Sequence, residues 1–307
     1  MKKMTNFTRI IGSLYQHDLS MKESGPNSKT PGTQYISGNI EIATDDAGIN
    51  IVPVHFTYVT ATTSTGKPNS TFNVLKNIID GVYKSVMEHG ADKAQKFRID
   101  SAIGLNEFYD RNDQFVSVKR NEGGFVHAIS SIDEAENKRN TFDVDIVITG
   151  VTHVEANEER NTPEKAVVKG AIFNFRNELM PVELSVLHPG AIDYFESLGA
   201  NTKNPVFTQV RGNQISETIV REIVEESAFG DPSVREVKNT RKDFVITWAK
   251  TEPYEWDDES SITAKEFLDA IAARETTLAT LKQRNDEYKA SKGTTPAAAP
   301  AAGGFNF

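Results

Sequence analysis

The chain has 307 residues, a formal net charge of −9 and no cysteine, and 38% of its residues are hydrophobic. This composition is typical of a soluble globular protein. It excludes disulfides and thiolate chemistry, and it argues mildly against a protein that binds polyanions over its whole surface. The first residues lack the apolar core of a signal peptide, and no apolar run reaches the roughly 18 residues that span a bilayer, so we expect a cytoplasmic protein.

The N-terminal third is predicted to be rich in β-structure. Residues 1–35 have one short apolar patch followed by a stretch rich in Ser, Gly and Pro, and we expect an N-terminal arm. Alternating apolar residues predict a hairpin over 36–60 with its turn at 45–48. Apolar residues at three- and four-residue spacing predict one helix over 71–89, and a second hairpin is expected to turn at 121–124.

The middle of the chain carries the clearest pattern. Successive segments are predicted to form three strands, a short helix and a fourth strand, at 142–154, 165–175, 180–186, 188–199 and 206–215. This is the chain order of an OB barrel once a fifth strand is supplied, and 244–248 can supply it. We therefore predict a mainly β protein with accessory helices. We expect an OB-type barrel over 141–256 and, over 36–140, either another barrel or an insertion packed on it.

Two further segments complete the predicted organisation. Residues 216–227 fit a helix by their spacing and a strand by their β-branched side chains, and we expect a long strand or hairpin arm. Thr263 to Glu266 is a capping box, which opens a C-terminal helix within 257–292. Residues 293–307 are rich in Pro, Ala and Gly and are expected to be a disordered tail with an aromatic tip.

The last residues of the chain are Phe305-Asn306-Phe307. Two aromatic rings cannot fold on their own and are costly to expose. We expect Phe305 and Phe307 to bind an apolar pocket of a partner protein, with the terminal carboxylate as a polar handle. The alternative is that both rings fold back onto the parent domain or its binding groove.

No pattern in the chain indicates an active site. The six histidines lack the spacing of a helical zinc pair, and His153 with Glu155 is most simply a pair on the rim of a strand. Asp143 and Asp145 alternate on a strand and could hold metal ions in a nuclease, but a solvated strand face is the simpler interpretation. We expect no catalysis, no metal and no cofactor.

Aromatic residues flanked by Lys and Arg are the remaining candidates for function. They occur at 96–98, 108–111, 115–120 and 125–127, and single-strand binders use such interleaving to stack bases and meet phosphates. Strand parity extends the argument, because a face that carries both lysines and phenylalanines is not a dry core face. The predicted phosphate contacts are Lys165, Lys169, Arg176, Arg211, Arg241 and Lys242, and the predicted stacking rings are Phe173, Phe175, Phe207 and Trp248. The alternative for each ring is a place in the core.

Several segments of the second half carry a family likeness. They are Phe142 to Val154, Val167 to Gly170, Tyr194 with Phe195, Val210 to Asn213, Glu225 to Pro232 and Phe244 to Trp248, together with the plan of helix, linker and aromatic tip. In these segments the chain resembles the OB-fold single-stranded-DNA-binding proteins encoded by bacteriophages. The resemblance implies sequence-tolerant binding of single-stranded DNA in replication or recombination, in the cytoplasm of a bacterial host, with a tail that recruits replication proteins. The competing interpretations are a phage structural or morphogenesis protein and, more remotely, a nuclease that uses Asp143 and Asp145.

Overall fold

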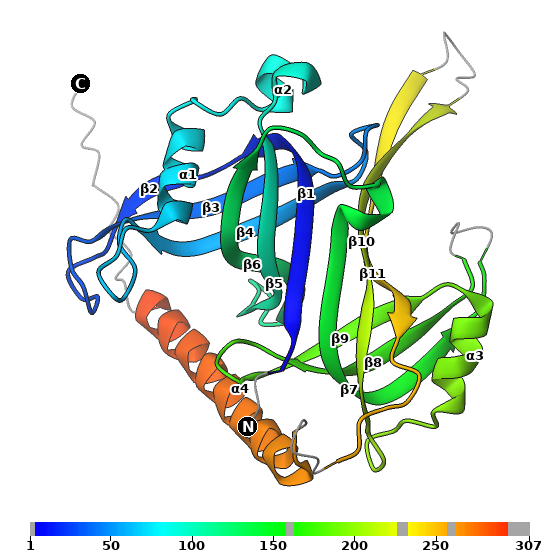
Figure 1. Cartoon of the computed structure of the whole chain (residues 1–307). Coiled ribbons are helices and arrows are strands. Elements are labelled where there is room, and N and C mark those ends of the chain that lie inside the picture. Colours follow the sequence, from blue (N-terminus) through cyan, green and yellow to red (C-terminus); the bar gives the residue numbers. More distant parts are fainter. Residues whose placement is uncertain (1–3, 158–162, 226–232, 257–261, 294–307) are drawn as a thin grey trace, which may run out of the picture.

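The computed structural model describes residues 4–157, 163–225, 233–256 and 262–293 (Figure 1). The strands are β1 (Asn6–His17), β2 (Ser20–Glu23), β3 (Gln34–Ala43), β4 (Ile51–Thr60), β5 (Lys96–Tyr109), β6 (Phe115–Ile129), β7 (Asn140–Val154), β8 (Lys165–Phe173), β9 (Leu179–Val186), β10 (Val206–Glu225) and β11 (Ser233–Ala249). The helices are α1 (Ser70–Ile79), α2 (Val86–His89), α3 (Pro189–Ser197) and α4 (Ala264–Gly293). The strands form one eleven-stranded sheet, so the prediction of a mainly β protein with accessory helices is confirmed.

The strands from β7 onward close into an OB-type barrel. β7 pairs with β8 and β8 with β9, both antiparallel. β9 then pairs in parallel with β11, β11 pairs antiparallel with β10, and β10 returns to β7. Helix α3 lies between β9 and β10 in the chain, so the order of elements and the closure of the sheet both match the predicted OB-type fold. We call this ring the second barrel.

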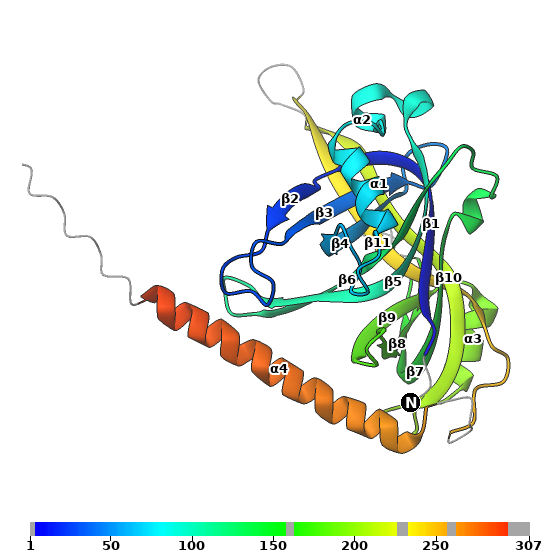
Figure 2. The ribbon, with the colours of Figure 1, turned by 60° about the vertical axis from the view of Figure 1, so that its left-hand side comes forward.

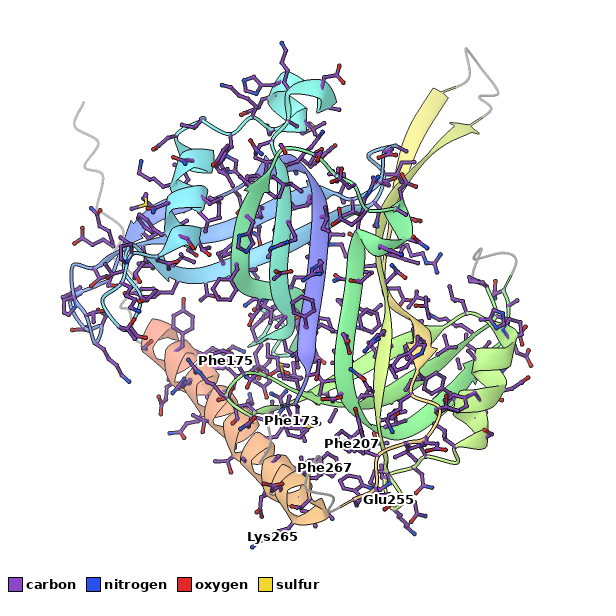
Figure 3. All side chains as sticks on the ribbon, viewed as in Figure 1. Phe173, Phe175, Phe207, Glu255, Lys265 and Phe267 are labelled. Carbon is purple, nitrogen blue, oxygen red and sulfur yellow. The ribbon has the colours of Figure 1, made fainter. Side chains whose placement is uncertain are left out.

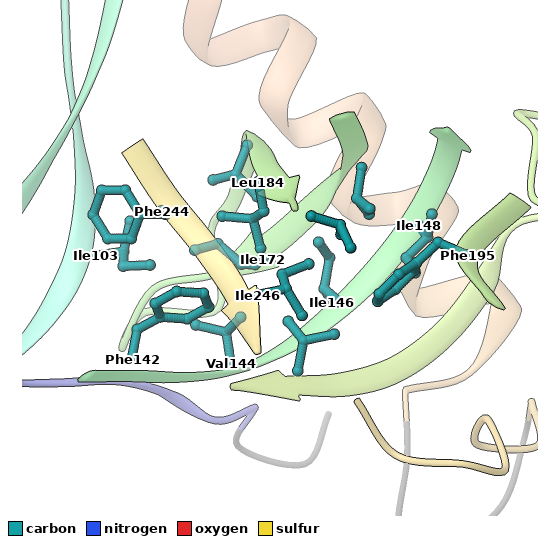
Figure 4. Close-up of a cluster of buried hydrophobic side chains, with 14 of the residues drawn as sticks. Ile103, Phe142, Val144, Ile146, Ile148, Ile172, Leu184, Phe195, Phe244 and Ile246 are labelled. Carbon is teal, nitrogen blue, oxygen red and sulfur yellow. The ribbon is translucent and has the colours of Figure 1, made fainter. Parts of the chain in front are cut away.

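The interior of the second barrel is filled by residues that alternate along its strands. Phe142, Val144 and Ile146 of β7 all point inward, as the two-residue period of a strand requires. They pack with Phe195 of α3 and Ile246 of β11 (Figure 4). The alternation that predicted the strand therefore also forms the core.

The strands before β7 close a ring with the same order of pairing, which we call the first barrel. β1 pairs with β3 and β3 with β4, both antiparallel, and β4 pairs in parallel with β6. β6 pairs antiparallel with β5, and β5 returns to β1. Its core contains Ile10, Ile40, Phe56 and Phe97, with Leu75 of α1 packed among them.

Strand β1 joins the two barrels. Its first residues pair with β7, from Asn6 opposite Val144 to Ile10 opposite Asn140, while later residues pair with β5 and β3. A buried amide contact reinforces this joint, because Asn121 Nδ2 of the first barrel donates to Gln214 Oε1 of the second at 2.8 Å. The rings therefore form one continuous sheet rather than two separate bodies.

Helix α4 runs from the second barrel past the ends of β5 and β6 (Figure 2). The predicted capping box begins it: Thr263 N donates to Glu266 Oε2 at 3.0 Å, and Glu266 N donates to Thr263 Oγ1 at 3.1 Å. Further along, Arg274 forms an ion pair with Glu107 of β5. Within the described ranges, no helix combines the length and the apolar character needed to cross a membrane.

The predicted N-terminal arm is wrong, because its apolar patch forms the central strand β1. Ile10 and Leu14 are fully buried in the first barrel. The strand that follows, β2, is short, and its four residues are exposed. The predicted single helix over 71–89 is also wrong. It breaks after Asp80 because Gly81 has a φ of +70°, and the chain resumes as the separate short helix α2.

The hairpin predicted to turn at 121–124 is one strand with a bulge. Gly123 and Gly124 have φ values of +61° and +110°, but β6 pairs with β5 on both sides of them. A Cβ atom on Gly124 would lie 2.1 Å from the carbonyl oxygen of Asp100. The two glycines therefore allow a close backbone approach within the ladder instead of a reversal of the chain.

Candidate nucleic-acid interface

A groove lies across the outer face of β8 and β9. One wall of the groove comes from these strands and the other from the first barrel. That wall is the part of β5 and β6 that extends beyond the first barrel, residues 103–121, which we call the β5–β6 ribbon. The groove has a volume of about 440 Å³ and is lined by Leu105, Ser117, Lys119, Thr149, Lys169, Gly170, Pro181, Val182 and Glu183. In an OB fold this strand face is the one that binds oligonucleotides.

Lysines gather in and beside this groove. Lys119 Nζ donates to the backbone carbonyl oxygen of Glu183 and lies 5.2 Å from the ring centroid of Phe244. Burial lowers the pKa of Lys119, with the nearby carboxylates of Asp243 and Glu183 opposing the shift. Lys169 Nζ is 3.5 Å from Glu183 Oε1. Both side chains are more than half exposed.

Lys165 occupies a different position from the one we predicted. Its Nζ is 3.1 Å from Ser185 Oγ and 3.4 Å from Asp243 Oδ2, and its side chain is largely covered. It therefore crosses from β8 over β9 to β11 and helps to hold these strands together. Together with Lys119 and Lys169 it still gives this region three lysines against two carboxylates.

The turn between β8 and β9 presents an exposed ring. Phe175 is 78% exposed, and the guanidinium carbon of Arg176 lies 5.1 Å from its ring centroid. Asn174 builds the turn, because its Oδ1 accepts from the backbone nitrogens of Arg176 at 2.9 Å and Glu178 at 3.0 Å. Asn177 takes a left-handed conformation with a φ of +61°. This ring is open to a ligand and has a cation beside it; the predicted contacts of Phe175 and Arg176 with DNA stay predictions.

Phe173 and Phe207 are predicted stacking rings that the structure buries, so these two predictions are wrong. Both point to the outside of the second barrel, but Phe173 is fully buried and Phe207 is 2% exposed. Tyr254 lies 4.7 Å from Phe207, measured between ring centroids, and Phe267 of α4 belongs to the same cluster (Figure 3). Phe173 does lie on the outer side of its strand, as the alternation of side chains predicts. However, the segment that leads into α4 covers this part of the outer surface.

Arg211 and Trp248 lie on a different part of the outer surface of the second barrel, opposite each other on β10 and β11. The guanidinium carbon of Arg211 is 4.6 Å from the Trp248 ring, and Trp248 is 43% exposed. Arg211 Nε donates to Asp143 Oδ2 at 2.8 Å. The structure therefore does not bring these two residues into the groove with Lys169.

Arg241 and Lys242 are on β11, paired with Glu217 and Ser216 of β10. Arg241 is half-buried and Lys242 is exposed. Their predicted phosphate contacts stay predictions, as do the roles of Phe305 and Phe307, which lie outside the described residues.

The acidic residues of β7 do not form a pair open to solvent. Asp145 is buried, accepts from Thr5 N at 2.6 Å and lies 3.4 Å from the Tyr254 hydroxyl. Asp143 is engaged by Arg211 and Gln209. The structure therefore contradicts the solvated-face interpretation for Asp145. In the described part of the chain, no cluster of three His, Asp or Glu residues could hold a metal ion.

His153 is held by carboxylates rather than by a metal. Its Nδ1 lies 2.8 Å from Glu196 Oε1 of α3, and its Nε2 lies 3.2 Å from Glu164 Oε1. The hydrogen bond to Glu196 raises the pKa of His153 above its ordinary value. His153 therefore links β7 to α3 and to the residue before β8. These contacts are with Glu196 and Glu164, not with Glu155.

The equivalent face of the first barrel lies across β3 and β4. It carries the rings of Tyr35 and Tyr58, whose centroids are 4.4 Å apart, and Tyr58 is partly exposed. His55 Nδ1 lies 2.9 Å from Asn39 Oδ1, and burial lowers the pKa of this histidine. Asp18 bonds the other end of the Asn39 amide. Lys22 of the neighbouring β2 donates to Ser37 Oγ, and the charges of Arg120 and Lys22 add to the effect of burial on the pKa of His55. In the described residues this face therefore offers rings with fewer lysines than the groove.

Sequence reasoning missed the contribution of the ribbon to the groove. Lys119 belongs to an interleaved stretch, but nothing in the sequence places it beside Glu183, which is 64 residues away. Leu105 shares its side of the ribbon because the two residues pair across β5 and β6. The useful signal was the recurrence of aromatic and basic residues in the first half of the chain.

Two rings of strands with the pairing order of an OB barrel, joined through β1, define this chain as a tandem-barrel protein of the OB class. The chain belongs to the YorF family, which it matches over residues 6–284. No curated protein matches it.

Two of the solved structures that this chain matches are described as proteins that bind single-stranded DNA or as bound to it. One is a deletion mutant of the single-stranded DNA binding protein from Thermus aquaticus. It is 11% identical, with a TM-score of 0.47 and coverage of 84% of this chain and 100% of that one. The other is a Replication Protein A heterotrimer bound to single-stranded DNA, at 10% identity and a TM-score of 0.23, with coverage of 89% and 70%.

Proposed function

We propose that this protein binds single-stranded DNA without strong sequence preference, in replication or recombination, and that it is encoded by a bacteriophage and works in the cytoplasm of the host. The groove across β8 and β9 carries this proposal. It lies on the strand face that OB folds use for oligonucleotides, and its walls come from both barrels. A strand laid along it would contact Lys119 on one side and Lys169 on the other.

The charges of the groove support a phosphate backbone as the ligand. The whole chain has a net charge of −9, yet three lysines meet two carboxylates in this region. Glu183 contacts Lys119 through its backbone carbonyl oxygen and Lys169 through its carboxylate, so a phosphate could replace that carboxylate as the partner of Lys169. Such an exchange would be sensitive to salt.

An exposed ring at the turn between β8 and β9, the two strands that carry the groove, supports stacking. Phe175 is exposed at the turn after β8 with Arg176 against it. A base stacked on such a ring is worth about 1–3 kcal/mol in single-strand binders and requires no particular sequence. The first barrel has Tyr58 on its corresponding face, where Lys22 and Arg120 lie near His55. Because three lysines gather at the groove, we assign the main phosphate contacts to the second barrel.

The tail belongs to the same proposal. We propose that Phe305 and Phe307 recruit a replication or recombination protein, because these two rings follow a Pro/Ala/Gly linker that cannot bury them. Deleting 305–307 should leave the affinity for DNA unchanged or slightly raised and should abolish capture of that partner.

Titration of a fluorescent oligo-dT at several salt concentrations tests the proposal. We expect tight binding whose logarithm falls with the logarithm of salt by about 0.7 for each phosphate contacted. The double variant Lys119→Ala/Lys169→Ala should bind roughly tenfold more weakly, with a slope smaller by about 1.4. Lys203→Ala, on the loop between α3 and β10, is the matched control and should bind like the wild type.

Absence of binding by the wild type at low salt would contradict the proposal and favour a structural role in phage assembly. Cleavage of the oligonucleotide in magnesium would favour a nuclease. Binding that the Lys119 and Lys169 variants leave unchanged would show that the groove is the wrong site.

A further inference from the structure

The pairing of β1 with β7 creates a sheet face that neither barrel has alone. Six strands follow one another in the order β6, β5, β1, β7, β10 and β11, through pairings that all are antiparallel. Figure 1 shows β6, β5, β1 and β7 side by side. Residues directly opposite in an antiparallel pair point to the same side, so the outer residues of these strands share one surface.

The register places basic and aromatic residues in neighbouring rows on this surface. In one row Phe125 lies opposite Asp100, Asp100 opposite Arg9, and Arg9 opposite Thr141. In the next row, Phe7 lies opposite Asp143, Asp143 opposite Arg211, and Arg211 opposite Trp248. Arg98 and His127 form a third row beside the first. We call this set the shared sheet face.

The rings of the shared sheet face are open or backed by arginine. Phe125 is 65% exposed, so its ring is open to a ligand. The guanidinium carbon of Arg9 lies 5.2 Å from the Phe7 ring, and Arg211 lies against Trp248 in the same way. Rings interleaved with guanidinium groups are the surface on which single-strand binders stack bases.

The cations of this face outnumber the acids that pair with them. Asp100 serves both Arg9, at 2.9 Å, and Arg98, at 3.8 Å, and Asp143 serves Arg211. The Nε of Arg98 is buried and has no hydrogen-bond partner in the described residues, so it is the rest of the guanidinium group that a ligand can reach. These three arginine side chains remain 42–53% exposed, which leaves them able to contact a ligand.

We infer that the shared sheet face is a second contact surface for single-stranded DNA, outside the groove of β8 and β9. The inference rests on the proposed function. Charge supports this class of ligand: on a chain of net charge −9, this face has three arginines for two paired carboxylates, and a phosphate backbone needs such a local excess of cations. A polyanion with stackable bases matches both this excess and the rings of the face.

The dimensions of the face set which DNA it can bind. Phe125 and Trp248 are five strand steps apart, or about 24 Å at the usual spacing between strands. A short oligonucleotide that fills the groove of β8 and β9 would not reach this face. A longer one that continues past the groove would add contacts with Arg98 and Phe125.

Oligo-dT of two lengths tests the inference with the full chain. A length of about 8 nucleotides suits one barrel, and about 35 exceeds two barrels at the upper end of the usual site size. The double variant Arg98→Gln/Phe125→Leu should bind the short oligonucleotide within twofold of the wild type. It should bind the long one about tenfold more weakly, and the salt slope for the long one should fall by about 0.7.

Arg98→Lys with Phe125→Tyr keeps the cation and the ring and should restore most of the affinity for the long oligonucleotide. The melting temperature of each variant shows whether it is folded. If the Arg98→Gln/Phe125→Leu variant binds each length as tightly as the wild type does, the inference is overturned but the proposed function stays intact. A change of oligomeric state in sedimentation with unchanged DNA affinity overturns it in favour of contact between copies of the chain. No binding of either length by the wild type refutes the proposed function itself.

Discussion

The side chain of Lys119 reaches from β6 of the first barrel to the backbone carbonyl oxygen of Glu183 on β9 of the second. Its stem also brings Nζ to 5.2 Å from the ring centroid of Phe244. One lysine therefore links the two barrels at the groove and supplies a cation to it. This double position makes its substitution informative.

Lys119→Met should separate these two roles. The methionine keeps much of the packing of the stem on Phe244 but removes the charge and the donor. Because Asp243 and Glu183 keep Lys165 and Lys169 as partners, the substitution leaves neither carboxylate unpaired, and we expect a melting temperature within a few degrees of the wild type. Oligo-dT affinity should fall about threefold to tenfold in a fluorescence titration. Lys119→Arg, which keeps the charge, should bind DNA normally; a loss equal to that of Lys119→Met would mean that the charge is not what matters.

Phe173→Ala and Phe175→Ala should differ although the two residues are neighbours on the chain. Phe173 is fully buried beneath the segment leading into α4, so its truncation should lower the free energy of unfolding by about 3–5 kcal/mol. Phe175 is exposed, so its truncation should change stability by less than about 0.5 kcal/mol. It should weaken oligo-dT binding by about 1–3 kcal/mol if a base stacks there. Denaturant unfolding and the same titration check both. A stable Phe173→Ala protein would contradict the covered face.

His153→Gln should reveal a stability difference that depends on pH. The hydrogen bond to Glu196 raises the pKa of the folded histidine above the ordinary value of 6.5. The protonated form therefore stabilises the fold fully below about pH 6.5, and this contribution is lost as the pH rises through the folded pKa. We expect the wild type to melt above His153→Gln in acid and to approach it in alkali. Equal melting temperatures for the two proteins throughout would argue against the bridge to Glu196.

Asp113→Asn should loosen α4 from the tip of the β5–β6 ribbon. Lys289 and Lys282 hydrogen-bond this carboxylate and lower its pKa to about 2. Because the folded pKa lies below the ordinary 3.8, the contribution is present above pH 3.8 and lost as the pH falls through about 2. We expect faster amide hydrogen exchange over 278–290 in the variant at neutral pH, and less difference in high salt because exposed pairs are screened. Unchanged exchange in low salt would show that Asp113 does not hold this end of α4.

Elements with a strong local period could be predicted from the sequence. The alternation of Phe142, Val144 and Ile146 indicated β7 and the core side of that strand, and the capping box indicated the start of α4. The order of strands and helix in the second half indicated the OB-type barrel. Predictions failed where glycine has more than one use: Gly124 permits a bulge in β6 rather than a turn, and Gly81 breaks a helix that the apolar spacing would continue.

By itself the sequence determined which residues lie on the same side of each strand, because side chains alternate with a period of two. Only the tertiary structure decided what covers each side. The segment before α4 buries Phe173 and Phe207, while the pairing of β1 with β7 places Arg9 beside residues of the second barrel. It also brought Lys119 to Glu183. These contacts join residues distant in the chain, and they depend on sheet closure and packing, which no local period encodes.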